Sequence, residues 1–386
     1  MIERLEVDGF KSLRDISLET RSLNILVGPN ASGKSTLLQT LLLLRQSADP
    51  TGQVEVLSLS GELYEAGTPL DAIHPAAGHV VTIGVASEMG EWTGRFEHRR
   101  EAERLGGERR LAATTQGRLA PTIFERNGRF AYLNAERIGP RVSYELPLTG
   151  EELSGRVGKQ GEYTTALLAR AFNSDYVAPT WNKEIAGHFD KVLHVIAEHE
   201  RSGRLADTQG SLFRLCNAML GWVIPGAEFS ATEHSETDTA TILFTRDPNG
   251  IKAKTRPTHV GFGLSYTLPI IVAALSLSRG GLLLVENPEA HLHPLSQSRM
   301  GVFLALVASL GHQIFVETHS DHFVNGVRLA ARFGLLPQGS GRFFFFENTL
   351  ASEHSRITPI DLDARGRLSD WPPGFFDQIE RDLARI

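Results

Sequence analysis

A nine-residue stretch near the N-terminus constrains the fold more than any other feature of the chain. Residues 28–36 read GPNASGKST, which fits the pattern G-x-x-x-x-G-K-[ST] without a gap. An apolar run, 23–27, precedes it and a leucine-rich run, 37–44, follows it. This is the strand, loop and helix context of a phosphate-binding loop, which surrounds phosphates with backbone N–H groups at a helix N-terminus. We therefore expect a nucleotide-binding α/β domain.

Each part of this loop has an expected task. The glycines let the backbone close around the β- and γ-phosphates of ATP, Lys34 neutralises phosphate charge, and the Ser35 hydroxyl binds Mg²⁺. The expected nucleotide-binding residues are Gly28, Pro29, Asn30, Ala31, Ser32, Gly33, Lys34, Ser35 and Thr36.

Charge, cysteine count and hydropathy narrow the class of protein. The net charge of −6 over 386 residues provides no global basic field for nucleic acid. Cys216 is the only cysteine, so it forms no intramolecular disulfide and no cysteine-rich metal site. The N-terminus lacks a signal-peptide pattern, and no apolar run approaches the roughly 20 residues that span a bilayer. We expect a soluble, cytoplasmic protein with no membrane partner.

Hydrophobic periodicity predicts the remaining elements. The run 282–285, a helix over 294–310 and the run 313–316 give a β-α-β order with fully apolar strands, which is typical of a parallel sheet covered on both faces. The other expected elements are an edge strand over 2–10, antiparallel strands at 80–85 and 130–133, helices over 163–171, 184–200, 212–223 and 267–277, and a β pattern at 239–246. The helices between 143 and 235 would form a mainly helical insertion.

Acidic and histidine side chains follow the apolar strands. Glu286 ends the run that begins at 282, where the Mg²⁺ of a bound nucleotide is held. His319 follows the next strand and could bond the γ-phosphate or position the attacking water. The four residues His291, His293, His319 and His322, with acids close by, also leave a metal site open.

Ser265 follows the glycine-containing stretch 260–263 and opens a predicted helix. Its hydroxyl could cap that helix, or it could bind a phosphate at the helix N-terminus. The residues alone leave both interpretations open.

These elements, in this order, resemble the ATPase heads of the SMC, RecF and OLD branch of the ABC class. The resemblance rests on FKSLRDISLETRSLNILVGPNASGKSTLL, on VGFGLSYTLP as a signature loop, on LLLVENPEAHLHP as the Mg²⁺-acid strand, and on FVETHSDHFVN as the switch-histidine segment. The stretches YLNAERIGPR and GRLSDWPPGFFDQIERDL are similar to one bacterial AAA-family subgroup whose C-terminal module has no assigned function.

The resemblance implies an ABC-type head, with a parallel core sheet and an antiparallel β subdomain, that forms a two-fold homodimer. Two ATP molecules would lie between the phosphate loop of one subunit and the signature loop of the other. Lys34 and Glu286 would act within a subunit, and Ser265 would act across the interface. His291 and His293 would be interface residues, which accounts for them without a metal. An interface that closes only with nucleotide is a bistable element that ATP can bias.

The sequence departs from the family pattern where the general base is expected. Asn287 follows Glu286 in place of the usual Glu, and an amide orients water but cannot take its proton. Glu289 could substitute as the catalytic base, or His319 alone could hold the water. Because losing a general base costs roughly 10²–10⁴ in rate, we expect slow hydrolysis. Gln46 is a candidate for the nucleotide-sensing glutamine of the family.

The predicted organisation has four parts: an N-terminal ATPase lobe over 1–142, the insertion over 143–235, a C-terminal ATPase lobe over 236–350, and a module of unknown function over 351–386. The acids of this last module look like turn and helix-start residues and not like a nuclease site. They are Asp361, Asp363, Asp370 and Asp377.

The favoured function is an ATP-binding dimeric switch that regulates a separately encoded effector, in anti-phage defence or in DNA maintenance. The defence assignment rests on family analogy. The alternative is an ATP-dependent DNA clamp, which requires the arginines between 95 and 110 to share a face with Arg201 and Arg204. A solvated surface is the simpler interpretation of that charged segment.

Overall fold

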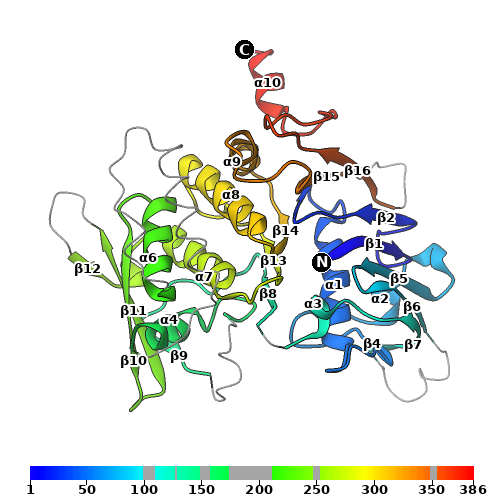
Figure 1. Ribbon diagram of the computed structural model, residues 1–386, viewed down its shortest axis with the longest axis horizontal. Coiled ribbons are helices and arrows are strands. Elements are labelled where there is room, and N and C mark those ends of the chain that lie inside the picture. The colour runs from blue at the N-terminus through cyan, green and yellow to red at the C-terminus, as the bar shows by residue number, and fades with distance from the viewer. Residues whose placement is uncertain (99–108, 127, 148–156, 174–210, 247–252, 348–353) are drawn as a thin grey trace.

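The computed structural model describes residues 1–98, 109–126, 128–147, 157–173, 211–246, 253–347 and 354–386. Within these ranges the strands form three sheets, with helices packed on and between them (Figure 1). This mixed architecture confirms the predicted α/β fold class. Among the described helices, none has both the length and the apolar composition needed to cross a bilayer.

The central sheet carries the strands of the predicted nucleotide site. Its order is β16 (Arg356–Asp361), β15 (Gly341–Glu347), β3 (Leu23–Val27), β14 (Gln313–Glu317), β13 (Leu282–Glu286) and β8 (Phe130–Leu133). Neighbours from β15 to β8 run parallel, and β16 runs antiparallel to β15. All residues of β3 are buried, as expected for a parallel strand covered on both faces.

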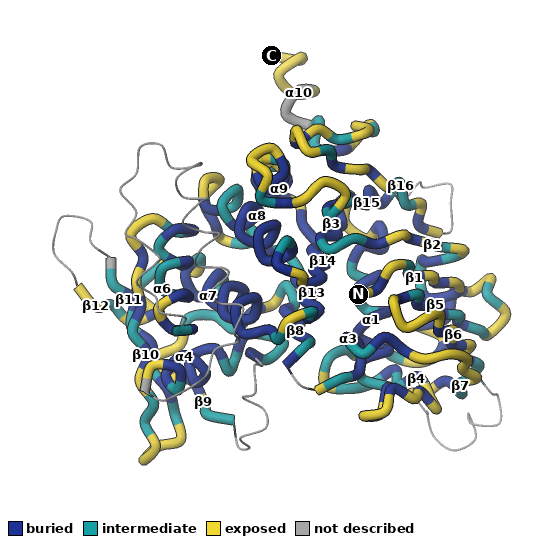
Figure 2. Tube along the Cα trace, in the orientation of Figure 1, coloured by how far each residue is buried: buried dark blue, intermediate teal, exposed yellow. Residues whose placement is uncertain are grey.

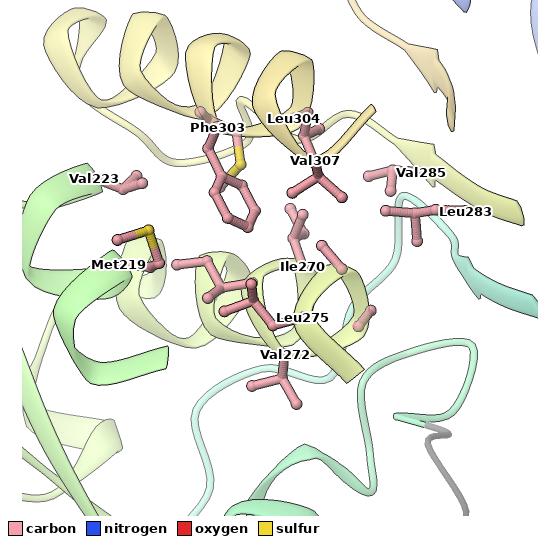
Figure 3. Close-up of a cluster of buried hydrophobic side chains, with 14 of the residues drawn as sticks. Met219, Val223, Ile270, Val272, Leu275, Leu283, Val285, Phe303, Leu304 and Val307 are labelled. Carbon is pink, nitrogen blue, oxygen red and sulfur yellow. The ribbon is translucent and has the colours of Figure 1, made fainter. Parts of the chain in front are cut away.

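Alternate residues of the central strands face two hydrophobic cores, because successive side chains of a strand point to opposite faces. Leu283 and Val285 join one core, with α6 (Leu212–Val223), α7 (Phe262–Ser276), α8 (Pro294–Ser309) and α9 (Asp321–Arg332). Figure 3 shows part of this core, where Met219 and Phe303 lie with the α7 side chains. Leu282 and Leu284 join the other core, which contains the leucines of α1 (Lys34–Ser47). Figure 2 shows β13, β14 and much of α7 and α8 coloured as buried.

An antiparallel sheet packs on the second core. Its order is β2 (Ile16–Glu19), β1 (Ile2–Asp8), β5 (Val80–Ser87), β6 (Gly90–Glu97), β7 (Arg110–Gly117) and β4 (Val56–Ser58). The prediction of an edge strand over 2–10 was wrong, since β1 lies between β2 and β5. Alternation shows that a strand has one buried face, but the position in the sheet depends on partners far along the chain.

A smaller sheet lies beside α4 (Thr164–Asn173) and α6. It consists of β10 (Glu228–His234), β11 (Thr239–Arg246) and β12 (Ala253–Thr255), and β9 (Tyr144–Glu145) also pairs with β11. The remaining helical segments are α2 (Pro69–Ala72), η1 (Pro75–Ala77), α3 (Pro121–Phe124), η5 (Pro257–His259) and α10 (Gln378–Leu383).

Two further sequence predictions need correction, and one lies outside the described residues. The run 130–133 was predicted as antiparallel, but β8 pairs in parallel with β13. A short, wholly apolar strand carries no signal of direction, and its partner lies about 150 residues away. The helix predicted over 267–277 begins five residues earlier, at Phe262. The helix predicted over 184–200 is outside the described residues.

Candidate ATP site

The phosphate loop joins the end of β3 to the start of α1, as its motif predicts. Gly28 has a φ of 139°, and a Cβ there would lie 2.2 Å from the Phe346 carbonyl oxygen of the neighbouring strand β15. Gly33 has a φ of 99°, and a Cβ there would meet the hydroxyls of Ser355 and Ser12 at 2.4 and 2.8 Å. Both positions therefore need glycine. Helix α1 begins at Lys34, so its free N-terminal amides point into the loop.

Lys34 is held inside the loop. Its Nζ donates to the carbonyl oxygens of Gly28 at 3.0 Å and Pro29 at 2.7 Å, and lies 3.8 Å from Glu317 Oε1. Burial lowers the pKa of the Lys34 amine, and the nearby carboxylates of Glu317 and Glu289 oppose that shift. The amine is thus preplaced where phosphate oxygens would replace its carbonyl partners.

Two acids end neighbouring strands beside the loop. Glu286 and Glu317 are paired in register across β13 and β14. Glu286 accepts from the Tyr132 hydroxyl at 2.8 Å and from the Ala135 amide at 3.3 Å. Burial raises the pKa of Glu286, while these two donors lower it. The structure therefore places Glu286, the predicted Mg²⁺ ligand, at the carboxyl edge of the sheet, where its hydrogen bonds go to Tyr132 of β8 and to the segment that follows β8.

Glu317 was given no role by the sequence reasoning. The residue is only 6% exposed. Burial raises its pKa to about 7, the Ser35 hydroxyl beside it lowers that pKa, and the Glu286 carboxylate raises it. The available signal was an acid at the end of a buried apolar strand, the same signal that identified Glu286.

The turn after β13 is fixed by a buried arginine that the sequence reasoning also missed. The Arg137 guanidinium donates to the carbonyl oxygens of Glu286 and Asn287, the latter at 3.2 Å. Arg137 is 2% exposed, and burial lowers its pKa to about 10, so it stays protonated at neutral pH. Its guanidinium also lies 5.7 Å from the ring centre of Tyr266 on α7.

Asn287 adopts a left-handed backbone conformation, with a φ of 45°. Asn tolerates this region better than most residues. Its backbone N–H donates to the Glu317 carbonyl oxygen at 2.8 Å. Its side-chain Oδ1 is buried and has no protein partner. That oxygen is available to a bound water.

Glu289 and His319 lie together. Glu289 Oε1 accepts from the His319 backbone amide at 2.7 Å, and its Oε2 is buried without a protein partner. Burial raises the pKa of Glu289, which suits a proton acceptor, and burial together with Lys34 lowers the pKa of His319, which is therefore neutral near pH 7. The two candidates from the sequence thus share one edge of the site with Lys34.

Ser265 does not cap its helix. Helix α7 begins after Gly261, so Ser265 lies in its first turns, and its buried hydroxyl has no protein partner. Pro269 inside α7 has no N–H for the Ser265 carbonyl, which loosens this end of the helix. Phe262, 51% exposed, and Tyr266 pack on His291, with ring centres 5.3 and 4.7 Å from the imidazole.

The other singled-out side chains have local tasks. His293 caps α8 by accepting from the Leu295 amide at 3.4 Å, and His322 lies 3.8 Å from Asp321. The interpretation of Gln46 was wrong. Its amide bonds the backbone of Ser58 and Tyr64 at the far end of α1, twelve residues beyond Lys34, which is about 18 Å along a helix.

The donors present fit a magnesium ion. Within the described ranges, no group of three or more His, Cys, Asp or Glu side chains converges on one point. Mg²⁺ does not require such a group, because it binds through one or two carboxylates with substrate phosphates and water. Ser35, Glu286 and the unpartnered Oε2 of Glu317 supply oxygen donors beside the loop.

The C-terminal segment borders the phosphate loop. A cavity of about 470 Å³ is lined by Gly28, Pro29 and His319 on one side, and by residues that include Phe375 and Arg381 on the other. Phe375 is buried and packs on the rings of β15. Two of the nearby acids serve turns, as predicted: Asp363 accepts from the amides of residues 365 and 367, and Asp377 from that of residue 374. The prediction for Asp361 was wrong, because it ends β16 and accepts from Arg342 at 2.7 Å.

The proposed DNA-binding arginines are only partly described. Arg95 pairs with Glu97 at 2.8 Å, and Arg109 pairs with Glu65 at 3.1 Å, all exposed side chains. These pairs are typical of a solvated surface. Residues 99–108, Arg201 and Arg204 lie outside the described residues.

The fold and the phosphate loop are those of a P-loop ATPase head. Three family models match parts of the chain, described as "AAA ATPase domain" over residues 1–69, "AAA domain, putative AbiEii toxin, Type IV TA system" over 183–325, and "Protein of unknown function (DUF3696)" over 338–386. These matches confirm the predicted ATPase class.

Solved structures have the same fold. A crystal structure of an SMC head bound to the C-winged helix domain of ScpA gives a TM-score of 0.53 at 14% identity, covering 94% of this chain and 98% of that one. The Smc head with an extended coiled coil, bound to the C-terminal domain of ScpA from Pyrococcus furiosus, gives 0.54 at 13% identity, covering 100% and 98%. Identities this low establish the fold alone. No curated protein matches the chain.

Proposed function

We propose that the chain is an ATP-binding switch that closes as a homodimer, hydrolyses ATP slowly, and regulates a separately encoded effector protein in the cytoplasm. One observation carries the proposal. The phosphate loop is complete within one subunit, with Lys34 preplaced in it, but the buried Ser265 hydroxyl has no hydrogen-bond partner in that subunit and is available to a second one.

In this mechanism the loop from Gly28 to Thr36 wraps the phosphates, and Lys34 exchanges its carbonyl partners for phosphate oxygens. Mg²⁺ would be held by Ser35 and the acids at the strand ends, Glu286 among them, and it would neutralise charge on the phosphates. Ser265, at the N-terminal end of α7, would contact the γ-phosphate of the ATP bound by the partner subunit.

Slow hydrolysis follows from the acid turn, which is the turn after β13 that carries Asn287 and Glu289. Asn287 can orient a water through its unpartnered Oδ1 but cannot remove a proton. Glu289, with its unpartnered oxygen and raised pKa, is the candidate base, and neutral His319 helps to position the water. A long-lived ATP dimer would then be the signalling state.

A protein partner is supported by two findings. SMC heads have been crystallised with domains of ScpA, and the family description over 183–325 names a putative toxin of a toxin–antitoxin system. We place the effector in anti-phage defence or DNA maintenance on this basis. Because the C-terminal segment borders Pro29 and His319, it is the part of the chain through which nucleotide state would reach that effector.

Light scattering with and without ATP, combined with steady-state turnover, tests the proposal. A Cβ at Gly261 meets no atom within 4 Å, and its φ is −63°, so Gly261→Glu adds a charge beside Ser265 without strain in the monomer. We expect ATP to dimerise the wild type, Gly261→Glu to bind ATP but stay monomeric, and Lys34→Ala to lose both binding and turnover. Wild-type protein that binds ATP and stays monomeric would refute the dimeric switch.

A further inference from the structure

The mechanism above leaves open which of the two strand-end acids, Glu286 or Glu317, touches the Mg²⁺. Glu317 ends β14, the strand between the phosphate-loop strand β3 and the acid strand β13. It is therefore one strand closer to the loop than Glu286. The residue is 6% exposed, so water does little to stabilise a negative charge on its carboxylate.

The two carboxylate oxygens of Glu317 have different surroundings. Oε1 lies 3.8 Å from Lys34 Nζ, and the Ser35 hydroxyl lies beside the carboxylate. Oε2 is buried and has no hydrogen-bond partner. A buried oxygen without a donor costs about 1–3 kcal/mol, and more when it is charged. ATP would draw the Lys34 amine toward its phosphates and away from Glu317 Oε1. Both oxygens of the buried carboxylate would then lack a positive partner, and a second cation beside them would stabilise the charge.

Glu286 is in a different position. Both of its oxygens have donors, from Tyr132 of β8 and from the Ala135 amide, on the side away from β3. Ser35 is among the groups that act on Glu317 and is not among those that act on Glu286. The loop hydroxyl expected to bind Mg²⁺ is therefore beside Glu317.

We propose that Glu317, together with Ser35, directly binds the Mg²⁺ that accompanies ATP, and that Glu286 contacts the ion only through water. This inference rests on the proposed function, because it needs ATP to bind at the loop. Mg²⁺ prefers a hard oxygen set of this kind, completed by phosphate oxygens and water.

Equilibrium binding of a fluorescent ATP analogue, measured in Mg²⁺ and again in EDTA, tests the inference. The ratio of the two affinities is the factor by which Mg²⁺ strengthens binding. Glu317→Gln keeps the side-chain volume and removes the charge, and Glu286→Gln removes one charge from the neighbouring strand end as a matched control. We expect the Mg²⁺ factor of Glu317→Gln to fall about 10-fold or more. Its affinity in EDTA should be equal or higher, because a negative charge beside the phosphates is gone.

Glu286→Gln should lower the Mg²⁺ factor by clearly less, and Glu317→Asp should restore part of it. Equal losses in the two Gln variants would be explained by charge alone and would overturn the proposal, as would a larger loss in Glu286→Gln or an unchanged factor in Glu317→Gln. If Glu317→Gln does not fold by circular dichroism, Glu317→Met, which also removes the charge and keeps a similar length, takes its place in the same comparison. Wild-type protein that binds the analogue in neither buffer would instead refute the proposed function.

Discussion

Arg137 offers the sharpest test of how the site is held together. It is 2% exposed, and its guanidinium donates to the carbonyl oxygens of Glu286 and Asn287, which form the turn that carries the candidate catalytic groups. Arg137→Met removes this clamp while keeping a long, unbranched side chain. The guanidinium bonds the turn after β13, whereas Lys34 Nζ bonds the carbonyl oxygens of Gly28 and Pro29, so ATP binding should remain.

The size of the effect follows from these contacts. Two partly buried carbonyls that lose their donor cost about 1–2 kcal/mol each, and losing the guanidinium above Tyr266 costs about 0.5–2 kcal/mol more. Relief from burying the charge offsets part of this, so we expect a net loss of stability of about 2–4 kcal/mol. A turn that shifts by about 1 Å should lower kcat about 100-fold.

Steady-state turnover, ATP affinity and urea unfolding of Arg137→Met should be compared with those of Arg137→Lys and Arg109→Met. A lysine can reach one carbonyl but cannot span both, so Arg137→Lys should fall between wild type and Arg137→Met. Arg109 is 57% exposed in an ion pair with Glu65, so its replacement should change nothing measurable. Wild-type kcat in Arg137→Met, or an equal loss of ATP affinity and kcat, would refute the positioning role.

Three other predictions concern separate parts of the molecule. Asn287→Asp, which suits the left-handed backbone as well as Asn does, should raise kcat about 10-fold if this side chain faces the attacking water; Asn287→Gly, as the backbone control, should not. Ser265→Ala removes a hydroxyl that has no hydrogen-bond partner, so the monomer should keep its stability and its ATP affinity. Light scattering should show weaker ATP-dependent dimerisation. Unchanged dimerisation would mean that Ser265 does not act at the interface. Burial, with Arg279 adding to it, lowers the pKa of His312 to about 4. The unfolded chain therefore binds a proton below about pH 6.5 that the native state refuses, and about 2 kcal/mol of stability should be lost between pH 7.5 and 5. His312→Leu should lose less stability over that range in urea unfolding, while the exposed His322→Gln should behave as wild type.

Local patterns were sufficient to predict the elements that build the site. The strands β3, β13 and β14 were recognised from their apolar composition, which reflects burial on both faces of the sheet. The phosphate loop was recognised because its glycines and lysine have fixed spacing. Pairing between distant segments was not predictable in this way. The direction of β8 depends on β13, and the place of β1 depends on β5, and neither partner leaves a trace in the strand itself.

Side-chain roles were predictable where a motif prescribes them and unpredictable where three-dimensional contact decides them. Arg137 and Glu317 lay in stretches that were noted for family resemblance, but only the fold shows that one clamps the acid turn and the other meets Lys34. Gln46 was the reverse case, because it has the expected residue type but lies at the wrong end of α1.

Asn287 shows why a departure from a family pattern needs a conformational explanation as well as a chemical one. From the sequence, an amide in place of a carboxylate means a missing base. In the structure, the same residue has a φ of 45°, and its backbone N–H donates to the Glu317 carbonyl oxygen. This hydrogen bond ties the acid turn to β14, the strand beside the phosphate-loop strand. Asn and Asp both satisfy that backbone, whereas Glu fits it less well. A chain that needs this turn can therefore keep Asn287 for its conformation and leave proton removal to Glu289, whose oxygen is free and whose pKa is raised. Slow hydrolysis would then depend on how far Glu289 lies from the water, and not on the amide alone.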